Sequence, residues 1–292
     1  MPPVKRGNPM EFSYYPGCSL HATGLEYDAS TRAVFESLGV KLVEIEDWVC
    51  CGASSAHSVS ADLALNLPAI NVALAQEANH GDLLAPCAAC FNRTKSADYA
   101  LRHDPARRRA IEEAVDFRYT GDVRVRNPLD VVINDIGLDT VASKVTRPLT
   151  GLKVVSYYGC LLVRPPHLME FDHPEYPVVM NQIVGTLGAD VRNWSYATDC
   201  CGGSASLPRV DIATRLVSGL AQHAREAGAS AIVTACPLCQ MNLEMRQAEK
   251  PHVPIFYFTE LMGLAFGLPE AHSWWGKHLI STTPVLSAAG LV

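Results

Sequence analysis

The chain of 292 residues lacks the features that define several large classes of protein. It has no run of about 18 consecutive apolar residues, the length that spans a bilayer. Its first ten residues are polar and proline-rich, with no apolar stretch behind them. We therefore expect no membrane span, no secretory signal and a cytoplasmic location. Because the net charge is −6 and the run Arg107-Arg108-Arg109 is balanced by Glu112 and Glu113, we expect no nucleic-acid partner.

Motifs for common organic cofactors are also missing. There is no glycine-rich phosphate loop or dinucleotide fingerprint, so we expect neither a flavin nor a nucleotide in this chain. A c-type haem needs CxxCH, but Cys90 is followed by Phe91 and Cys239 by Gln240. A ferredoxin-type CxxCxxCxxxCP run is absent as well.

What the chain does have is ten cysteines in two copies of one pattern, with none left over. Each copy is a lone cysteine, then a Cys-Cys-Gly triplet, then a CxxC pair. The first copy comprises Cys18, Cys50, Cys51, Cys87 and Cys90, and the second comprises Cys160, Cys200, Cys201, Cys236 and Cys239. Five thiols gathered twice in one chain predict two sites for soft metals.

The rest of the sequence repeats in register with the cysteines. Each half opens with an apolar strand that ends in Gly-Cys, at 12–18 and 154–160, and strands then alternate with helices. This alternation predicts βαβ units and a mainly parallel sheet. We therefore expect an α/β protein of two similar domains related by an internal repeat, residues 1–147 and 148–292. The hydrophobic content of 48% is enough for a core in each.

Several elements have predicted bounds that the structure tests. We expect a helix over 58–79 that Pro68 interrupts, a second helix over 210–226, and a short strand over 190–194. Residues 101–147 look like helices with connecting loops. Trp274-Trp275 and the tail beyond them are expected to dock on a surface, and the core of this chain is favoured over a partner.

Each cysteine group follows a predicted strand. In parallel sheets, functional residues collect beyond the carboxyl ends of the strands. All five thiols of a half can therefore converge at one sheet edge. This convergence is the physical basis for treating each set of five as one site.

Four kinds of thiol chemistry compete for these sites. Structural disulfides are disfavoured by the expected compartment and by the strain of bonding adjacent cysteines. An all-thiolate zinc site would use four cysteines and leave Cys18 and Cys160 spare. A thioredoxin-like dithiol would use only the CxxC pairs. Iron–sulfur binding uses the most thiols. Because adjacent cysteines cannot easily ligate opposite corners of a cubane cluster, their spacing favours a cluster of unusual type.

The repeated Cx(n)CCGx(n)CxxC pattern resembles the catalytic B subunit of heterodisulfide reductases, in the wider family of cysteine-rich CCG domains. The resemblance covers nearly the whole chain, including Tyr-Gly-Cys160, Cys200-Cys-Gly-Gly203, Ala235-Cys-Pro-Leu-Cys239 and the late run 261–268. It implies that each set of five cysteines holds one non-cubane 4Fe-4S cluster. It also implies that a disulfide is cleaved, or formed, between the two clusters by paired one-electron steps.

The resemblance further implies partners. These are a ferredoxin-like C subunit with two cubane 4Fe-4S clusters, a flavin-containing A subunit, and a disulfide or thiol substrate. The alternative function is an electron-transfer or scaffold subunit of an oxidoreductase, such as a lactate- or glycolate-oxidising or sulfur-oxidising complex, with no disulfide substrate of its own.

Five further residues follow cysteine groups closely enough to be candidates for assisting the reaction. The histidines would protonate a leaving thiolate, and the arginines would meet a substrate anion. The set is His21, His57, Arg93, Arg164 and Arg209.

Overall fold

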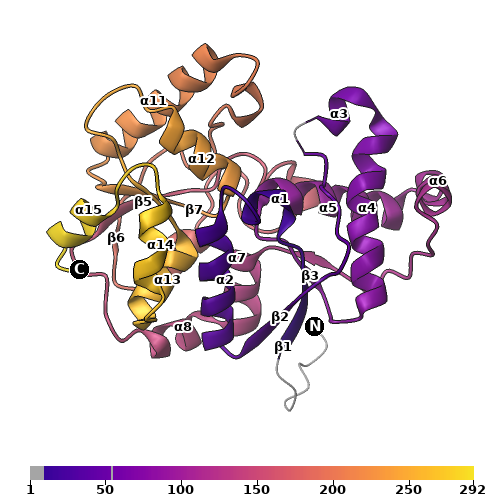
Figure 1. Ribbon diagram of the computed structural model, residues 1–292, viewed down its shortest axis with the longest axis horizontal. Helices are drawn as coiled ribbons and strands as arrows, with labels where there is room; N and C mark the ends of the chain where they lie inside the picture. Colours follow the sequence, from indigo (N-terminus) through magenta and orange to yellow (C-terminus); the bar gives the residue numbers. More distant parts are fainter. Residues whose placement is uncertain (1–9, 54) are drawn as a thin grey trace.

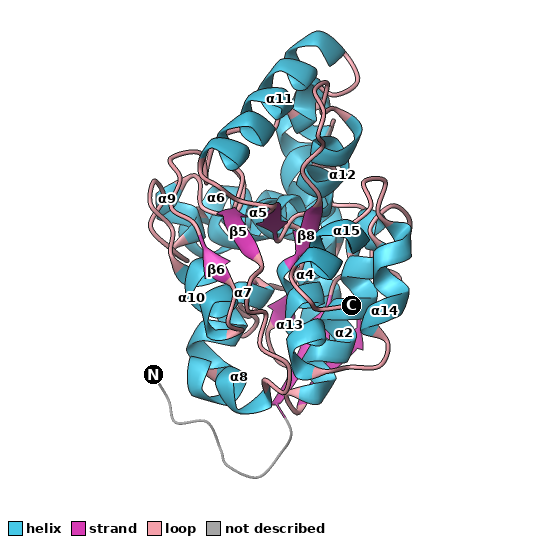
Figure 2. Ribbon diagram, turned by 90° about the vertical axis from the view of Figure 1, so that its left-hand side faces the viewer, coloured by secondary structure: helices cyan, strands magenta, loops and turns pink. Residues whose placement is uncertain are grey.

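The protein is described here by a computed structural model that covers residues 10–53 and 55–292. Its strands form two four-stranded sheets, one in each half of the chain, with helices packed around them (Figures 1 and 2). Every pairing between strands in both sheets is parallel. The predicted α/β class and the two similar halves are therefore confirmed.

The first sheet has the order β2-β1-β3-β4. Its central strand β1 pairs with β2 over five residues, from Met10 opposite Val40 to Tyr14 opposite Glu44. The strands are β1 (Met10–Tyr14), β2 (Val40–Glu44), β3 (Leu83–Leu84) and β4 (Val125–Arg126).

The second sheet repeats this order as β6-β5-β7-β8. The strands β5 and β7 are buried along almost their whole length, as expected for a parallel sheet that is covered on both faces. The strands are β5 (Lys153–Tyr157), β6 (Asp190–Val191), β7 (Ala231–Thr234) and β8 (Ile255–Tyr257).

The helices of the first half lie between its strands and after the fourth. They are α1 (Gly17–Leu20), α2 (Leu25–Ser37), α3 (Ala56–Val59), α4 (Ala61–Ala78), α5 (Ala88–His103), α6 (Pro105–Val115), α7 (Pro128–Val131), the π-helix η1 (Val132–Ile136) and α8 (Leu138–Lys144).

In the second half the helices continue to the C-terminus. They are α9 (Pro166–Met169), α10 (Val179–Thr186), the 3₁₀-helix η2 (Gly203–Ala205), α11 (Val210–Glu226), α12 (Pro237–Met245), α13 (Phe258–Phe266), α14 (Ala271–Trp274), the 3₁₀-helix η3 (Trp275–Lys277) and α15 (Thr283–Ala288).

Three predicted bounds were wrong. The helix expected over 58–79 breaks at Ser60, whose hydroxyl caps α4, and not at Pro68, which α4 accommodates in a buried turn. Proline removes one backbone hydrogen bond from a helix, but the packing of α4 against α5 preserves the helix here. The strand expected over 190–194 has only two residues, and β4 lies within the segment expected to be helices and loops.

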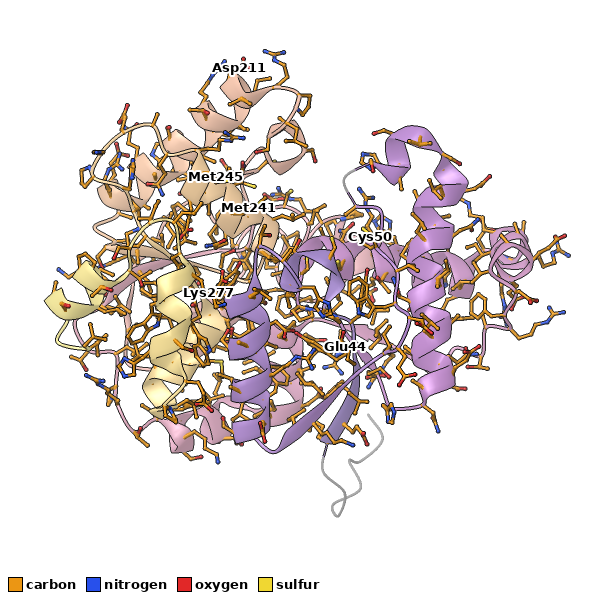
Figure 3. All side chains as sticks on the ribbon, in the orientation of Figure 1. Glu44, Cys50, Asp211, Met241, Met245 and Lys277 are labelled. Atoms are coloured by element: carbon orange, nitrogen blue, oxygen red, sulfur yellow. The ribbon has the colours of Figure 1, made fainter. Side chains whose placement is uncertain are left out.

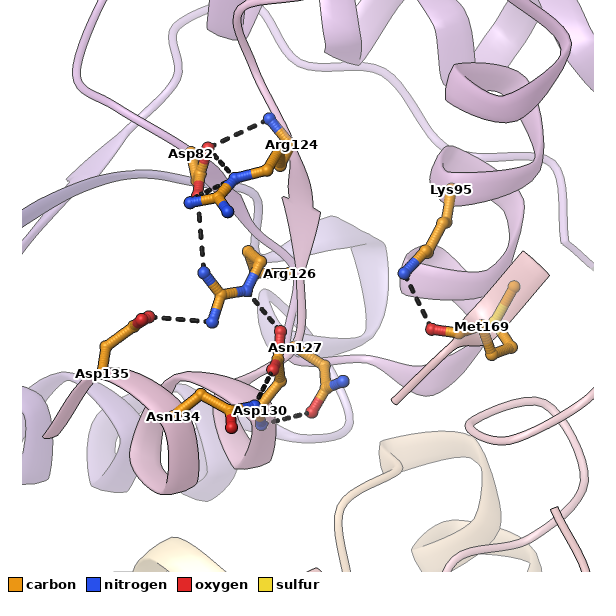
Figure 4. Close-up of polar contacts among 9 residues, drawn as sticks. All are labelled: Asp82, Lys95, Arg124, Arg126, Asn127, Asp130, Asn134, Asp135 and Met169. Carbon is orange, nitrogen blue, oxygen red and sulfur yellow. Dashed lines mark hydrogen bonds and ion pairs between the residues drawn. The ribbon is translucent and has the colours of Figure 1, made fainter. Parts of the chain in front are cut away.

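Ion pairs hold β4 to its neighbours (Figure 4). The guanidinium of Arg126, which is 9% exposed, pairs with Asp130 and with Asp135, the latter at 2.8 Å. Arg124, just before β4, pairs with Asp82, just before β3, at 2.7 Å. A two-residue strand offers few ladder hydrogen bonds, so these charges contribute to fixing its position.

After its fourth strand, each half contributes a helix that packs on the other half. Helix α13 packs on α2 of the first half, and α8 packs on α10 of the second half. The hydroxyls of Ser30 and Thr259, both fully buried, are 2.7 Å apart across the first contact. A boundary between residues 147 and 148 remains a prediction, and the core runs across it.

The C-terminal segment returns to the core of the chain. Trp274 is 2% exposed and Trp275 is 9% exposed. The side chain of Trp274 packs against Gly263 of α13, where a Cβ atom would lie 2.5 Å from the indole ring. The expected docking of the tail on this chain is therefore confirmed.

Candidate functional site

The lone cysteine of each half follows a glycine that no other residue can replace without strain. Gly17 and Gly159 have φ of +68° and +65°, in the left-handed region. A Cβ atom at Gly17 would lie 2.7 Å from the Cys90 sulfur, and one at Gly159 would lie 3.0 Å from the Cys239 sulfur. The Gly-Cys step thus brings the first and last cysteine groups of each set together.

A tyrosine three residues before each lone cysteine fixes the cysteine pair. The Tyr15 hydroxyl donates to the carbonyl of Val49 at 2.7 Å, and the Tyr157 hydroxyl donates to the carbonyl of Asp199 at 2.7 Å. Each acceptor is the residue immediately before the Cys-Cys pair. The sequence predictions did not include these tyrosines, although their identical offset from the lone cysteines was a signal for them.

The Cys-Cys-Gly triplets end in left-handed glycines packed against helices. Gly52 has φ of +68° and Gly202 has φ of +77°. A Cβ atom at Gly52 would lie 2.6 Å from Ala56, and one at Gly202 would lie 3.0 Å from Ala213. In each pair the first cysteine is exposed and the second is buried.

The CxxC cysteines begin helices. Cys87 and Cys236 are the N-cap residues of α5 and α12, and Cys90 and Cys239 lie in the first turns. All four are buried. A helix N-terminus carries partial positive charge, so this position favours the thiolate form that binds metals.

The sulfur atoms of each set lie close to one another. The distance from Cys50 to Cys18 is 3.9 Å, and that from Cys51 to Cys90 is 3.4 Å. In the second half, Cys201 and Cys239 are 3.7 Å apart. These distances exceed the disulfide bond length of about 2.05 Å, and all ten cysteines are free.

The two sets border each other where the halves meet. The interaction of Cys87 with Cys236 raises the pKa of the Cys87 thiol well above its usual value. The hydroxyl of Tyr27 is 3.3 Å from the carbonyls of Pro86 and of Ala235, the residues just before these cysteines. The two cysteine sets therefore lie next to each other at the border between the halves.

Contact between neighbouring thiols lowers the pKa of at least one thiol in each set. Contact with Cys50 lowers the pKa of Cys51 to about 3. Contact with Cys160 lowers the pKa of Cys200 to about 6. Each set therefore contains a thiol that is ionised near neutral pH, which is the form in which cysteine ligates metals.

The donor set fits an iron–sulfur group better than a single ion. Five sulfur donors per half, close together and largely buried, are the ligands that such clusters take. Within residues 10–53 and 55–292, there is no group of three or more cysteine, histidine, aspartate or glutamate side chains arranged to bind a single metal ion.

Both candidate histidines are exposed to solvent. The His21 Nε2 atom pairs with Glu44 at 3.1 Å, and its ring lies edge-on to Trp48. His57 is exposed on α3.

The three arginines differ in their surroundings. Arg209 is exposed and pairs with Asp211 at 2.8 Å. Arg164 contacts Glu175 at 2.8 Å and the Thr198 hydroxyl at 3.1 Å. Arg93 is half-buried on α5, and its Nε atom has no hydrogen-bond partner among the described residues. Of these three arginines, only Arg93 thus retains a buried polar atom without a partner of its own.

A comparison of the sequence with models of known protein families identifies the family of this chain. The model of the CCG cysteine-rich domain matches residues 12–94 and 154–244. The chain therefore belongs to the cysteine-rich CCG domain family, as the repeated motif predicted.

Named relatives are described as subunits of redox complexes. The chain is 34% identical over 283 residues to the 8-methylmenaquinol:fumarate reductase membrane anchor subunit of Wolinella succinogenes, and the match covers 94% of this chain and 98% of that protein. It is 26% identical over 273 residues to the B subunit of the ferredoxin/F(420)H(2)-dependent CoB-CoM heterodisulfide reductase of Methanosarcina acetivorans, covering 88% and 89%. The predicted resemblance to the B subunit of heterodisulfide reductases is therefore confirmed, and such relatives suggest iron–sulfur clusters and further subunits.

A solved structure with a similar fold is also known. A hypothetical protein from Helicobacter pylori superposes with a TM-score of 0.72 at 10% identity, covering 95% of this chain and 55% of that chain. This likeness extends to the fold alone. In the described part of the chain no helix is both long and apolar enough to cross a membrane.

Proposed function

We propose that this chain is the iron–sulfur subunit of a heterodisulfide reductase-like oxidoreductase complex, with two clusters side by side. The ligands of the first would be Cys18, Cys50, Cys51, Cys87 and Cys90, and those of the second Cys160, Cys200, Cys201, Cys236 and Cys239. The observation that carries this proposal is the Tyr27 hydroxyl, which lies 3.3 Å from the carbonyls of Pro86 and Ala235, because it brings the residues just before Cys87 and Cys236, from distant parts of the chain, to one border.

Each cluster is proposed to be a non-cubane 4Fe-4S cluster. Two features support this type over a cubane. Each set has five sulfur donors where a cubane needs four, and two of the five are adjacent in the chain, at Cys50-Cys51 and Cys200-Cys201.

The first candidate substrate is a disulfide. Iron–sulfur clusters carry electrons singly, so two of them at one border match the two electrons that cleave or form a disulfide. The heterodisulfide reductase relatives support this reaction. It would require a ferredoxin-like subunit with cubane clusters and a flavin-containing subunit as electron partners, in the cytoplasm.

The second candidate substrate is a quinol. It is favoured by the relative from Wolinella succinogenes, whose name includes a menaquinol and whose identity to this chain, 34%, exceeds the 26% of the heterodisulfide reductase relative. In this case the chain would be an electron-transfer subunit with no disulfide substrate.

The proposal is tested by iron and acid-labile sulfide per chain in protein purified without oxygen. About eight of each, two clusters of four, are expected. Cys87→Ser and Cys236→Ser should each lower the content toward about four, and the two variants serve as controls for one another. Zinc without sulfide after anaerobic reconstitution would refute the proposal.

The visible absorption of the clusters then distinguishes the two candidate substrates. The disulfide is added to the reduced protein, and the quinol is added to both the reduced and the oxidised protein. If a disulfide is the substrate, adding it should reoxidise the clusters at once, while a quinol leaves the spectrum unchanged. If a quinol is the substrate, it should reduce the oxidised protein, and the disulfide should have no effect.

A further inference from the structure

A pocket of about 400 Å³ opens where the two halves of the chain meet. Its wall includes side chains from α2 of the first half and from α12 and the C-terminal segment of the second. Apolar atoms come from Met241, Met245 and Leu279, of which Met245 is 52% exposed and Leu279 is 69% exposed. Figure 3 labels Met241 and Met245 on α12. These large apolar side chains face a cavity and not the core.

The pocket adjoins both cysteine sets through the chain itself. Gln240, which lines it, is the residue after Cys239. Ala22 and Thr23, which also line it, follow the short helix α1 that carries Cys18. A molecule in this pocket would therefore lie beside the elements that hold a cysteine from each set.

Two carboxyl groups and one ammonium group also line the pocket, from Glu26, Glu244 and Lys277. Glu244 is already committed, because its oxygens contact His278 Nδ1 at 2.9 Å and accept from the Leu279 amide at 2.8 Å. Glu26 is different: it is 3% exposed, and His278, the cationic group that acts on its pKa, is paired with Glu244 and Glu260 instead.

Burial raises the pKa of Glu26, and the charge of Glu260 adds to this effect. The charged groups of the surrounding elements are Glu244 on α12, Glu260 on α13, and Lys277 and His278 beyond α14. A buried carboxyl group at the wall of a pocket, with its own backbone amide as a neighbour and no cationic partner, is suited to accept a further hydrogen bond and then a proton from a ligand.

We propose that this pocket binds the ring of a quinol, with the ring against Met241, Met245 and Leu279 and one hydroxyl donating to Glu26. The proposal rests on the proposed function, takes up the second of its two candidate substrates, and assigns that substrate a binding site. Oxidation of the quinol to the quinone releases two electrons and two protons. The proposed iron–sulfur clusters would be the oxidant and would take one electron each, while Glu26 would take one proton and water the other.

Binding is tested without turnover, on the anaerobically purified full chain. The probe is 2-heptyl-4-hydroxyquinoline N-oxide, a fluorescent quinol analogue whose emission is quenched on binding. Glu26→Gln should weaken binding about tenfold, since it replaces a charged acceptor with a neutral amide that accepts a weaker hydrogen bond and cannot take the proton. Leu279→Glu, at an exposed position where folding is not threatened, should weaken it at least as much by placing a charge on the apolar wall.

Two matched controls should bind as the wild type does. Glu36→Gln changes an exposed glutamate on the same helix α2, and Val59→Glu adds a charge at an exposed apolar residue on α3. Equal affinity in the wild type and both pocket variants would overturn the proposal, as would the absence of binding. The iron and sulfide content is measured on the same samples, so eight irons with no quenching would refute the quinol pocket alone, and quenching without iron would refute the clusters alone.

Discussion

The protein is predicted to depend on a buried charge at His278 that ties its C-terminal segment to the second half. The side chain of His278 is 0% exposed. Its Nδ1 atom lies 2.9 Å from Glu244 on α12, and its Nε2 atom lies 3.0 Å from Glu260 on α13. Burial lowers the pKa of His278, but the two carboxylates outweigh it and raise the pKa to about 10.

The sign of the resulting pH dependence follows from linkage. An unfolded histidine has a pKa of 6.5, so below that value the proton is bound in both states and the stabilisation is fully present. As the pH rises from 6.5 to about 10, only the folded state keeps the proton, and the contribution is lost. At 1.36 kcal/mol per pKa unit, the whole contribution is about 5 kcal/mol.

The perturbation is His278→Gln, and the assay is urea unfolding followed by tryptophan fluorescence between pH 6 and pH 9. The difference in the free energy of unfolding between wild type and variant should shrink by about 1.4 kcal/mol per pH unit above pH 6.5. His272→Gln, at an exposed histidine of the same segment, should leave the pH dependence unchanged. A difference that is the same at pH 6 and pH 9 would show that His278 is uncharged in the folded protein and refute the reasoning.

Two further predictions follow from close contacts. Gly17→Ala should cost about 1–2 kcal/mol of backbone strain and also lower the iron content, because the new Cβ meets the Cys90 sulfur; Gly39→Ala has a similar φ and open space around it, so it should cost the strain and keep the iron. Ser30→Ala should lower the free energy of unfolding by about 1–3 kcal/mol, because it leaves the buried Thr259 hydroxyl without its partner; urea unfolding checks it, and an unchanged midpoint would contradict it.

The elements that the sequence predicted well are those with long periodic patterns. The helix expected over 210–226 is α11, residue for residue. The strands β4, β6 and β8 have two or three residues each, too few to show a period. Their place in the sheets is set by tertiary contacts such as the ion pairs of Arg124 and Arg126, which have no local signature.

The candidate site was also predicted only in part from the sequence. The grouping of the thiols followed from the rule that functional residues lie beyond the carboxyl ends of parallel strands. The roles of Tyr15 and Tyr157 depend on which carbonyl faces the hydroxyl, which a sequence does not specify. The candidate His21 followed a cysteine as closely as any ligand would, yet its partner is Glu44, a carboxylate at the end of the neighbouring strand β2.

The exchange of helices between the halves bears on why two CCG domains occupy one chain. Because α13 covers α2 and α8 covers α10, neither half buries its own first long helix without the other. The repeat boundary near residue 148 therefore divides the sequence, but not the core. Tyr27 lies on this shared core and contacts the residues before Cys87 and before Cys236. The spacing of the two thiol sets is thus fixed by packed, buried side chains, and a pair of one-electron carriers held there would keep the constant separation that paired electron transfer requires.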